Sequence, residues 1–321
     1  MSITNRRVAR AAIASMALLA AGMAHAADKL RFANGGFGLW AVEGPRLGQQ
    51  GGIFAKYGLE VEAYGTAGAG ETIQAVVSGS ADMSVGVGAT GVLGAYAKGA
   101  PIRVFGSNFV GAGDLFFYVK ADSPIKSLKD ADASRTMGYS TAGSSSNLTV
   151  LAVIDELGLK AKAFATGDQP ATLTQVLSGQ VDIGFATPPF ALKEVDEGKI
   201  RVVGNGNDAP SLRAQSVRLD IVGLKLLNER PDVFARFVRA YRETLDWMYT
   251  DPEAVRLWAA SINVPVELAK RAAYEFQPRS ARDPDNIVGL DALMASATRQ
   301  KFLARPLTPA QIADMVVKPK Q

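Results

Sequence analysis

The chain has 321 residues, of which 48% are hydrophobic and 21% charged, with 35 lysines and arginines against 31 aspartates and glutamates. It contains no cysteine and one histidine, His25. A chain of this length buries a large core without disulfides. The composition excludes a Cys–His nucleophile and a thiolate-bound metal site.

The first 26 residues predict a cleaved signal peptide. Three arginines, at 6, 7 and 10, precede a short apolar run at 11–21, and an A-x-A cleavage signature occupies 24–26. The run is too short to span a membrane. We expect cleavage after Ala26 and a periplasmic location. The arginine pair leaves the choice between general secretion and twin-arginine export open.

Removal of this leader changes the charge and the available chemistry. The leader holds three arginines, no acid and the single histidine, which leaves 32 basic and 31 acidic residues. Without a basic tract we expect no nucleic-acid binding. Without histidine a Ser-His-Asp triad is excluded, so we expect no catalysis, no cofactor and no metal. Carboxylate pairs or a Ser–Lys device would remain possible in an enzyme.

The mature chain alternates strands with helices, which indicates a mostly parallel sheet. The expected strands are 30–34, 59–64, 82–87, 102–106, 136–140, 160–165, 182–186 and 200–203. The expected helices are 40–56, 71–78, 90–98, 148–157, 171–178 and 187–197, and further helices at 231–249, 265–274, 309–317 and from 252 should pack on the first lobe.

An internal repeat explains this order. Residues 58–83 and 158–183 align without a gap at an offset of 100, with identities that include the Asp82/Asp182 pair in equivalent turns. Two copies at so long a period exclude a solenoid. They predict two similar α/β lobes, with the extended segments 115–120 and 216–224 as the crossings between them. We expect both aspartates to have a structural role, as turn or cap residues.

The repeat also divides the chain. We expect a signal peptide at 1–26, the first part of lobe 1 at 27–113, lobe 2 at 114–215, and the second part of lobe 1 with the C-terminal helices at 216–321. Ligands of parallel sheets bind where strands lead into helix N-termini, and these favour anions. The corresponding loops, which contain no lysine or arginine, are 34–40, 66–70, 86–90, 140–147, 166–169 and 187–189.

Loop 141–147 is the strongest candidate for ligand contact, because four of its seven residues carry hydroxyls. One of Ser145, Ser146 and Asn147 should cap the following helix. Phe37 and Trp40 would stack on the ligand or belong to the core. The predicted ligand-binding residues are Gly35, Gly36, Phe37, Trp40, Gly88, Ala89, Thr90, Ser140, Ser144, Ser145, Ser146, Asn147, Thr187 and Pro188.

Two further possibilities concern residues outside this set. Phe109 would line the hinge, or belong to the core. Asp114, Asp168 or Asp208 would pair with an amine on the ligand. Each would otherwise be a solvated carboxylate in a loop. Without cations in the predicted loops, recognition should rest on backbone N–H groups, hydroxyls and aromatic rings.

Several segments resemble the nitrate/sulfonate/taurine class of periplasmic solute-binding proteins. They are SGSADMSVG at 78–86, AKGAPIRVFG at 97–106, SPIKSLKDA at 123–131, YSTAGSSSN at 139–147 and SGQVDIGFATPPFAL at 178–192. The resemblance implies the type II periplasmic-binding fold: two similar Rossmann-like lobes joined by a two-strand hinge, with extra C-terminal helices. Relatives read D-L-x-G-K before the second-lobe strand, whereas this chain differs at 130–135, away from the expected pocket.

The resemblance also implies a function. By the family's pattern, residues 36–37, 88–90, 144–147 and 187–188 would meet a sulfonate, nitrate, taurine or aromatic acid ligand. A monomer would close around this solute by hinge motion and present it to an ABC transporter permease. The alternatives are a protein that presents its closed form to a sensor, or a pyrimidine-precursor enzyme on the same fold. The enzyme depends on a histidine that the mature chain lacks.

Overall fold

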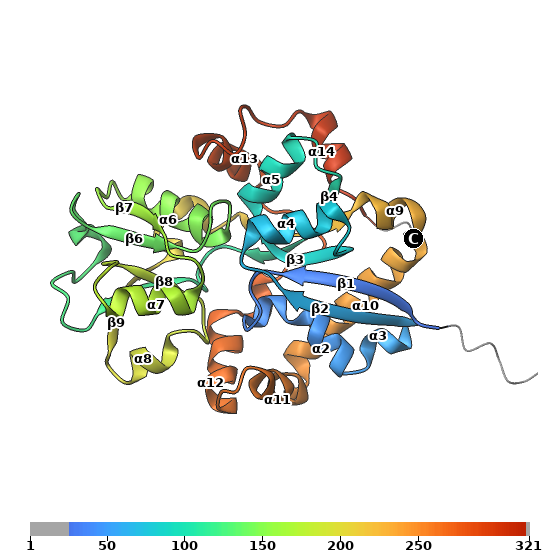
Figure 1. Ribbon diagram of the computed structural model, residues 1–321, viewed down its shortest axis with the longest axis horizontal. Coiled ribbons are helices and arrows are strands. Elements are labelled where there is room, and N and C mark those ends of the chain that lie inside the picture. The colour runs from blue at the N-terminus through green and yellow to red at the C-terminus, as the bar shows by residue number, and fades with distance from the viewer. Residues whose placement is uncertain (1–25, 319–321) are drawn as a thin grey trace, which may run out of the picture.

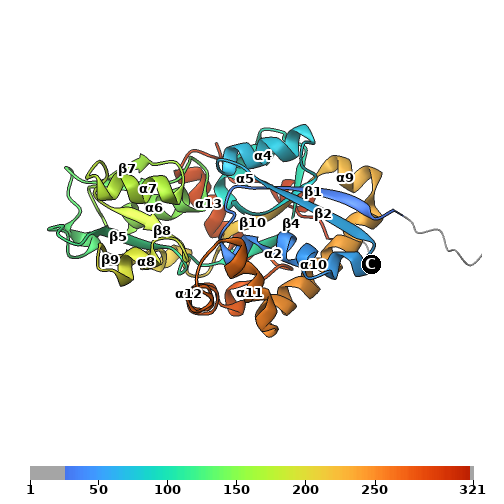
Figure 2. The ribbon, with the colours of Figure 1, turned by 60° about the horizontal axis from the view of Figure 1, so that its bottom comes forward.

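The protein consists of two lobes that lie side by side (Figures 1 and 2). The computed structural model describes residues 26–318. Residues 1–25 of the predicted leader lie outside this range. No helix within this described range is long and apolar enough to cross a membrane.

The first lobe contains a five-stranded sheet in the order β2-β1-β3-β10-β4. Strand β1 pairs in parallel with β2 and β3, and β10 runs antiparallel between β3 and β4. The bounds are β1 Asp28–Asn34, β2 Leu59–Gly65, β3 Met83–Gly88, β4 Ile102–Val110 and β10 Ser216–Gly223.

The second lobe repeats this arrangement. Strands β8, β5 and β9 form one sheet, β6 and β7 form a parallel pair, and a bridge between Met137 and Ile183 links the two. The bounds are β5 Phe116–Lys120, β6 Thr136–Tyr139, β7 Lys162–Ala165, β8 Gly184–Ala186 and β9 Ile200–Asn205. The crossings predicted at 115–120 and 216–224 are β5 and β10, and each is the antiparallel strand of its sheet.

The repeated turns carry equivalent hydrogen bonds. Asp82 accepts the backbone N–H of Arg31 at 2.8 Å, and Asp182 accepts that of Thr136 at 2.9 Å. Both aspartates also contact an arginine, Asp82 through Arg31 and Asp182 through Arg135. The turn role predicted for both aspartates is therefore confirmed.

The helices of the repeat lie close to the predicted positions, but other predicted helices are divided. The helix expected at 40–56 is three pieces, and the second of its two breaks falls at Gly52, which adopts a left-handed φ of 70°. The helix expected from Thr187 begins only at Leu192, since Ala191 has a left-handed φ of 63°, which a helix cannot include. The bounds are η1 Trp40–Val42, α2 Gly44–Gln50, α3 Ile53–Lys56, α4 Ala69–Ser78, α5 Ala89–Ala97, α6 Ser145–Glu156, α7 Gln169–Leu177 and α8 Leu192–Asp196.

The C-terminal part is helical and packs mainly on the first lobe, as expected. Helix α10 contacts α2 and α3, α13 contacts α5, and α14 contacts β4. The helix predicted at 265–274 divides into α12 and a π-helical turn, and α9 and α13 were not predicted. The bounds are α9 Leu224–Glu229, α10 Pro231–Thr250, α11 Pro252–Ser261, α12 Val266–Arg271, the π-turn Ala272–Phe276, α13 Leu290–Arg299 and α14 Pro309–Met315.

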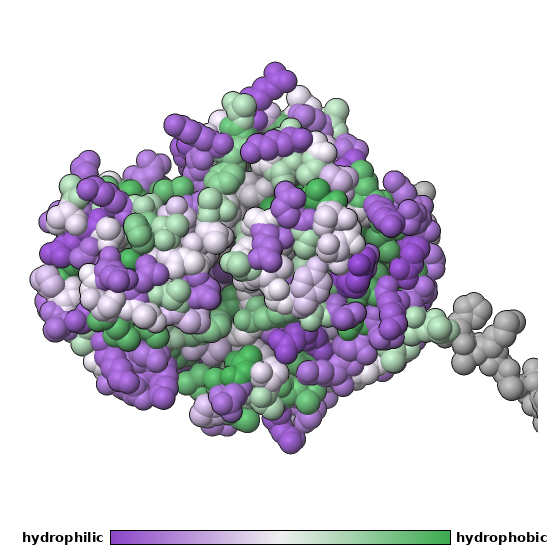
Figure 3. All heavy atoms as spheres, in the orientation of Figure 1, coloured by the Kyte–Doolittle hydropathy of each residue, from purple (hydrophilic) through white to green (hydrophobic). Residues whose placement is uncertain are grey.

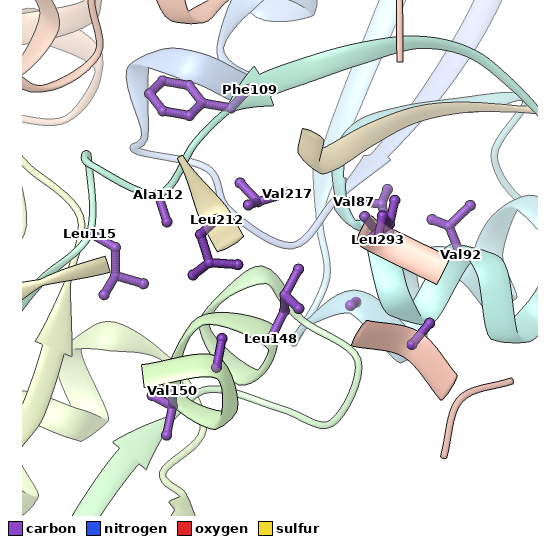
Figure 4. Close-up of a cluster of buried hydrophobic side chains, with 14 of the residues drawn as sticks. Val87, Val92, Phe109, Ala112, Leu115, Leu148, Val150, Leu212, Val217 and Leu293 are labelled. Atoms are coloured by element: carbon purple, nitrogen blue, oxygen red, sulfur yellow. The ribbon is translucent and has the colours of Figure 1, made fainter. Parts of the chain in front are cut away.

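One hydrophobic cluster continues from lobe to lobe. Figure 4 shows Val87 of the first lobe and Leu148 of the second in the same cluster as residues from the crossing segments, such as Leu115 and Val217. All four side chains are at least 96% buried. The lobes are therefore joined by packed apolar surface beside the crossings, and the cavity lies next to this junction.

Candidate functional site

A cavity of about 310 Å³ lies between the lobes. A small hollow is visible at the seam between them in Figure 3. Every one of the six loops that the sequence predicts for the site contributes lining residues. These loops follow the carboxyl ends of β1, β2, β3, β6, β7 and β8, because parallel strands of one sheet end at the same edge.

Arg218 is the cation of this cavity. It lies on β10, lines the cavity and has a side chain only 5% exposed. Its Nη1 donates to Asp114 Oδ2 at 2.7 Å, and its Nε donates to Ser145 Oγ at 3.2 Å. The guanidinium carbon lies 5.2 Å from the centroid of the Phe109 ring. Three contacts therefore fix the guanidinium.

This arginine gives the cavity a cation, which the absence of lysine and arginine from the predicted loops did not lead us to expect. The loops do lack lysine and arginine, but Arg218 reaches the cavity from a strand. A signal existed in the sequence: Arg218 and Asp220 interrupt the apolar strand 216–223. Charged residues in such a strand are rarely buried unless they are paired. The partner Asp114 lies 104 residues away, so the sequence alone did not reveal the pair.

Asp114 is the buried counter-charge of Arg218. Its side chain has no exposed surface. Burial raises the pKa of the Asp114 carboxyl, and the Arg218 guanidinium opposes this effect. Removal of one partner would leave the other buried without compensation, which is strongly destabilising.

A cluster of serines lies at the start of α6. The hydroxyls of Ser140, Ser144 and Ser146 lie 2.9–3.0 Å from one another. Ser144 Oγ accepts the backbone N–H of Asn147 at 3.1 Å and is therefore the helix cap. The predicted caps Ser145, Ser146 and Asn147 are wrong, because the helix begins earlier than expected, at Ser145.

Nine of the predicted site residues line the cavity. Their side chains or backbones come from both lobes, which the repeat anticipated. They are Gly35, Gly36, Phe37, Gly88, Ser140, Ser144, Ser145, Ser146 and Thr187. The sequence missed other lining residues, among them Arg218, Phe185 and Phe190.

The structure places the other five predicted residues behind the cavity wall. Trp40 is fully buried, with its ring 5.0 Å from that of Trp258, so it belongs to the core and does not stack on the ligand. Ala89 and Thr90 are fully buried in the first turn of α5. Asn147 Oδ1 accepts the Gly143 N–H, and the Pro188 carbonyl accepts from Gln277 Nε2.

The structure also places Phe109 and the acids that were expected near the ligand, and they do not all line the cavity. Phe109 lies beneath Arg218 and is 2% exposed, so it packs behind the site. Asp208 accepts the Asn205 N–H at 2.8 Å within its own turn and does not line the cavity. Asp168 lines the cavity and caps α7, where it accepts the Ala171 N–H at 2.7 Å. Of the three acids, only Asp168 therefore lines the cavity.

The lobes touch around the cavity. The Gly91 N–H of the first lobe donates to the Gly143 carbonyl of the second at 3.2 Å. Within residues 26–318 no group of three or more histidine, cysteine, aspartate or glutamate side chains could hold a metal ion. The site therefore combines one paired arginine with the Asp168 carboxylate, amide and hydroxyl side chains, backbone groups and aromatic rings.

Comparison with known proteins identifies the family. The model of the family described as "NMT1/THI5 like" matches residues 44–255. The chain belongs to the NMT1/THI5-like family. No curated protein sequence shows significant similarity to it.

Solved structures confirm the predicted fold. The alkanesulfonate-binding protein SsuA from Xanthomonas axonopodis pv. citri, bound to MOPS, has a TM-score of 0.71 at 17% identity, over 90% of this chain and 98% of that chain. The periplasmic nitrate-binding protein NrtA from Synechocystis PCC 6803 has a TM-score of 0.66 at 15% identity, over 89% and 84%. This NMT1/THI5-like chain therefore has the type II periplasmic-binding fold.

A further similar structure is a cysteine-to-serine mutant of DszB in complex with biphenyl-2-sulfinic acid. Its TM-score is 0.64 at 18% identity, over 91% of this chain and 97% of that chain. The substitution in that protein replaces a cysteine, whereas this NMT1/THI5-like chain contains none.

Proposed function

We propose that this protein is a periplasmic solute-binding protein that captures one small anion between its lobes and delivers it to an ABC importer. Arg218 is the observation that carries the proposal. Its Nη1 and Nε are engaged, and its Nη2 has no hydrogen-bond partner among residues 26–318. A guanidinium that lines a cavity with one side unused is suited to a sulfonate or carboxylate oxygen.

Helix N-termini support the same ligand charge. Helices α4, α6 and α7 all begin at the cavity, since Ala69, Ser145 and Gln169 line it. The free N–H groups and the positive dipole ends of α4 and α6 favour a negative guest, whereas the Asp168 carboxylate already occupies the start of α7. The similar structures include proteins named for alkanesulfonate and nitrate.

The cavity-lining residues are the proposed binding residues. Delivery requires a monomer that is exported, loses its leader after Ala26, closes on its ligand and docks on a permease. Both lobes contribute to the wall, so hinge opening would admit the ligand and closure would retain it. Uptake of radiolabelled ligand by cells with and without the gene tests delivery.

The anion site is tested with the double variant Arg218→Gln/Asp114→Asn. The pair of substitutions removes both buried charges together and so avoids an unpaired carboxylate. We expect the variant to melt close to the wild type and to bind sulfonates and carboxylates roughly 10–100-fold more weakly, as expected for the loss of a charged hydrogen bond. Isothermal titration calorimetry measures this affinity.

Arg256→Gln is the matched control, because the side chain of Arg256 is 68% exposed on α11. It should leave the affinity unchanged. Unchanged anion affinity in the double variant, or equal affinity for a neutral sulfonamide, would refute the proposed role of Arg218. Absence of binding to any anion would refute the proposed function itself.

A further inference from the structure

A second cavity adjoins the first. It has a volume of about 300 Å³, and its wall combines the first lobe, the second lobe and the segment between α11 and α12. Phe37 and Phe190 line both cavities, one ring from each lobe. The complete lining of the second cavity is Phe37, Gly38, Arg46, Pro189, Phe190, Ile262 and Val264.

The two phenylalanines form the partition between the cavities. A Cβ atom added at Gly38 would lie 3.1 Å from the Phe190 ring, so the first-lobe loop closely approaches this ring. Both phenylalanines are partly exposed. The partition therefore includes these two side chains, each of which lines both cavities.

The second cavity differs from the first in chemistry. Its one charged side chain, Arg46, lies over the Phe37 ring at 4.9 Å and 3.6 Å from Glu43 Oε1. The other side chains, Pro189, Phe190, Ile262 and Val264, are apolar. In Figure 3, apolar side chains gather over α12 below the seam. Apart from Arg46, which is paired with Glu43 and lies over Phe37, the lining side chains of the second cavity are apolar, whereas the first cavity holds Arg218 and a cluster of hydroxyls.

We propose that the ligand is amphiphilic, with its anionic head at Arg218 and an apolar alkyl or aryl body that passes Phe37 and Phe190 into the second cavity. This inference rests on the proposed function. Each cavity alone is at the lower end of the size range of small-molecule sites, and together they match a larger ligand. A compact ion such as nitrate would leave the apolar cavity unused.

A homologous series of ligands tests this inference. We would titrate the mature protein with methanesulfonate, butanesulfonate, octanesulfonate and benzenesulfonate by calorimetry. The head stays constant, so affinity should rise about fourfold per methylene that enters the apolar cavity. Equal affinity for methanesulfonate and octanesulfonate would overturn the inference but leave the proposed function standing. Absence of binding throughout the series would overturn the proposed function.

The variant Val264→Asp locates the body of the ligand. Val264 is partly exposed at the second cavity, and a carboxylate there should reduce octanesulfonate affinity at least tenfold while methanesulfonate affinity stays unchanged. Val202→Asp is the matched control, because Val202 is 44% exposed and lines neither cavity. Equal effects on both sulfonates, or none, would overturn the assignment. If Val264→Asp does not fold, the isosteric Val264→Thr should show a smaller loss of the same selectivity.

Discussion

The N-termini of α4 in the first lobe and α7 in the second lobe occupy equivalent positions of the repeat. At α4 the hydroxyls of Thr66 and Thr72 lie 2.6 Å apart, and at α7 those of Thr166 and Thr172 lie 2.6 Å apart. The second threonine of each pair donates to the carbonyl at the start of its helix. The repeat therefore preserves side-chain contacts as well as the backbone path.

The two helix N-termini differ at the residue that precedes each helix. Asp168 caps α7 with its side chain, whereas Gly68 precedes α4 without a side-chain cap. Gly68 has a φ of 154°, and a Cβ atom there would lie 2.7 Å from Thr141 Oγ1 of the other lobe. The first lobe therefore lacks a cap at the point where the second lobe approaches. Both the approach of the other lobe and the backbone conformation therefore favour glycine at this position.

The largest effect should come from Gly68→Ala. The added methyl group collides with Thr141 when the lobes meet, and the backbone conformation is unfavourable for alanine. We expect ligand affinity to fall about 10–100-fold and the free energy of unfolding to fall by about 1–3 kcal/mol. Calorimetry and urea unfolding measure these two changes.

Gly70→Ala is the matched control for this prediction. It lies inside α4 with no atom within 4 Å of an added Cβ, so it should bind normally and be slightly more stable. The additional substitution Thr141→Ala should restore part of the affinity of Gly68→Ala. Equal affinities of Gly68→Ala and Gly70→Ala would show that the lobes do not close on Gly68.

The next effect comes from Asp220, a buried carboxyl on the crossing strand β10. It should make the free energy of unfolding depend on pH. Burial raises the pKa of Asp220 to about 6, although the Gly86 N–H that it accepts lowers it. The folded state then binds more protons than the unfolded state between pH about 4 and 6. The stabilising contribution is complete below pH about 4 and is lost as the pH rises through about 6, a change on the order of 3 kcal/mol.

Asp220→Asn should abolish this contribution while keeping the oxygen that accepts from Gly86. The difference in unfolding free energy between variant and wild type should therefore change in favour of the variant from pH about 4 to about 6.5. Urea unfolding at several pH values measures it. A difference that stays constant over this range would contradict the buried ionisation of Asp220.

The repeated turn gives a smaller effect with the opposite dependence on pH. Although burial acts to raise the pKa of Asp182, hydrogen bonds from Thr136 and Arg135 lower it below the ordinary value. This contribution is present above pH about 4 and is lost as the pH falls through the lowered pKa. We expect Asp182→Ala to cost about 1–3 kcal/mol at pH about 7 and less at pH about 2–3, as measured by urea unfolding. A cost that grows at acid pH would be inconsistent with this assignment.

The smallest effect should come from the cap itself. Asp168→Ala removes the side chain that accepts the Ala171 N–H and should cost about 1 kcal/mol. Thermal unfolding without ligand measures this loss. The matched control is Ser178→Ala at the other end of α7, whose hydroxyl donates to the Gln175 carbonyl on the exposed side. A loss no larger than that of the control would indicate that the cap contributes nothing.

Much of the fold was predictable because it is encoded locally. Apolar periodicity and glycine punctuation located the strands and helices of the repeat, and the offset of 100 residues made each lobe a check on the other. The predicted helix 40–56 was wrong because Gly52 breaks it, a conformation that the apolar spacing does not reveal. The six ligand loops were predictable because the carboxyl ends of parallel strands share one edge.

The chain sequence by itself thus determined two lobes, the loops between them and a hydroxyl-rich helix start in the second. Tertiary structure alone decided that Trp40 belongs to the core, that Arg218 enters the cavity and that Asp114 neutralises it. The physical reason is the range of the interactions. Periodicity and capping involve neighbours in sequence, whereas a buried charge is stabilised by a partner that only the folded chain brings within hydrogen-bonding distance.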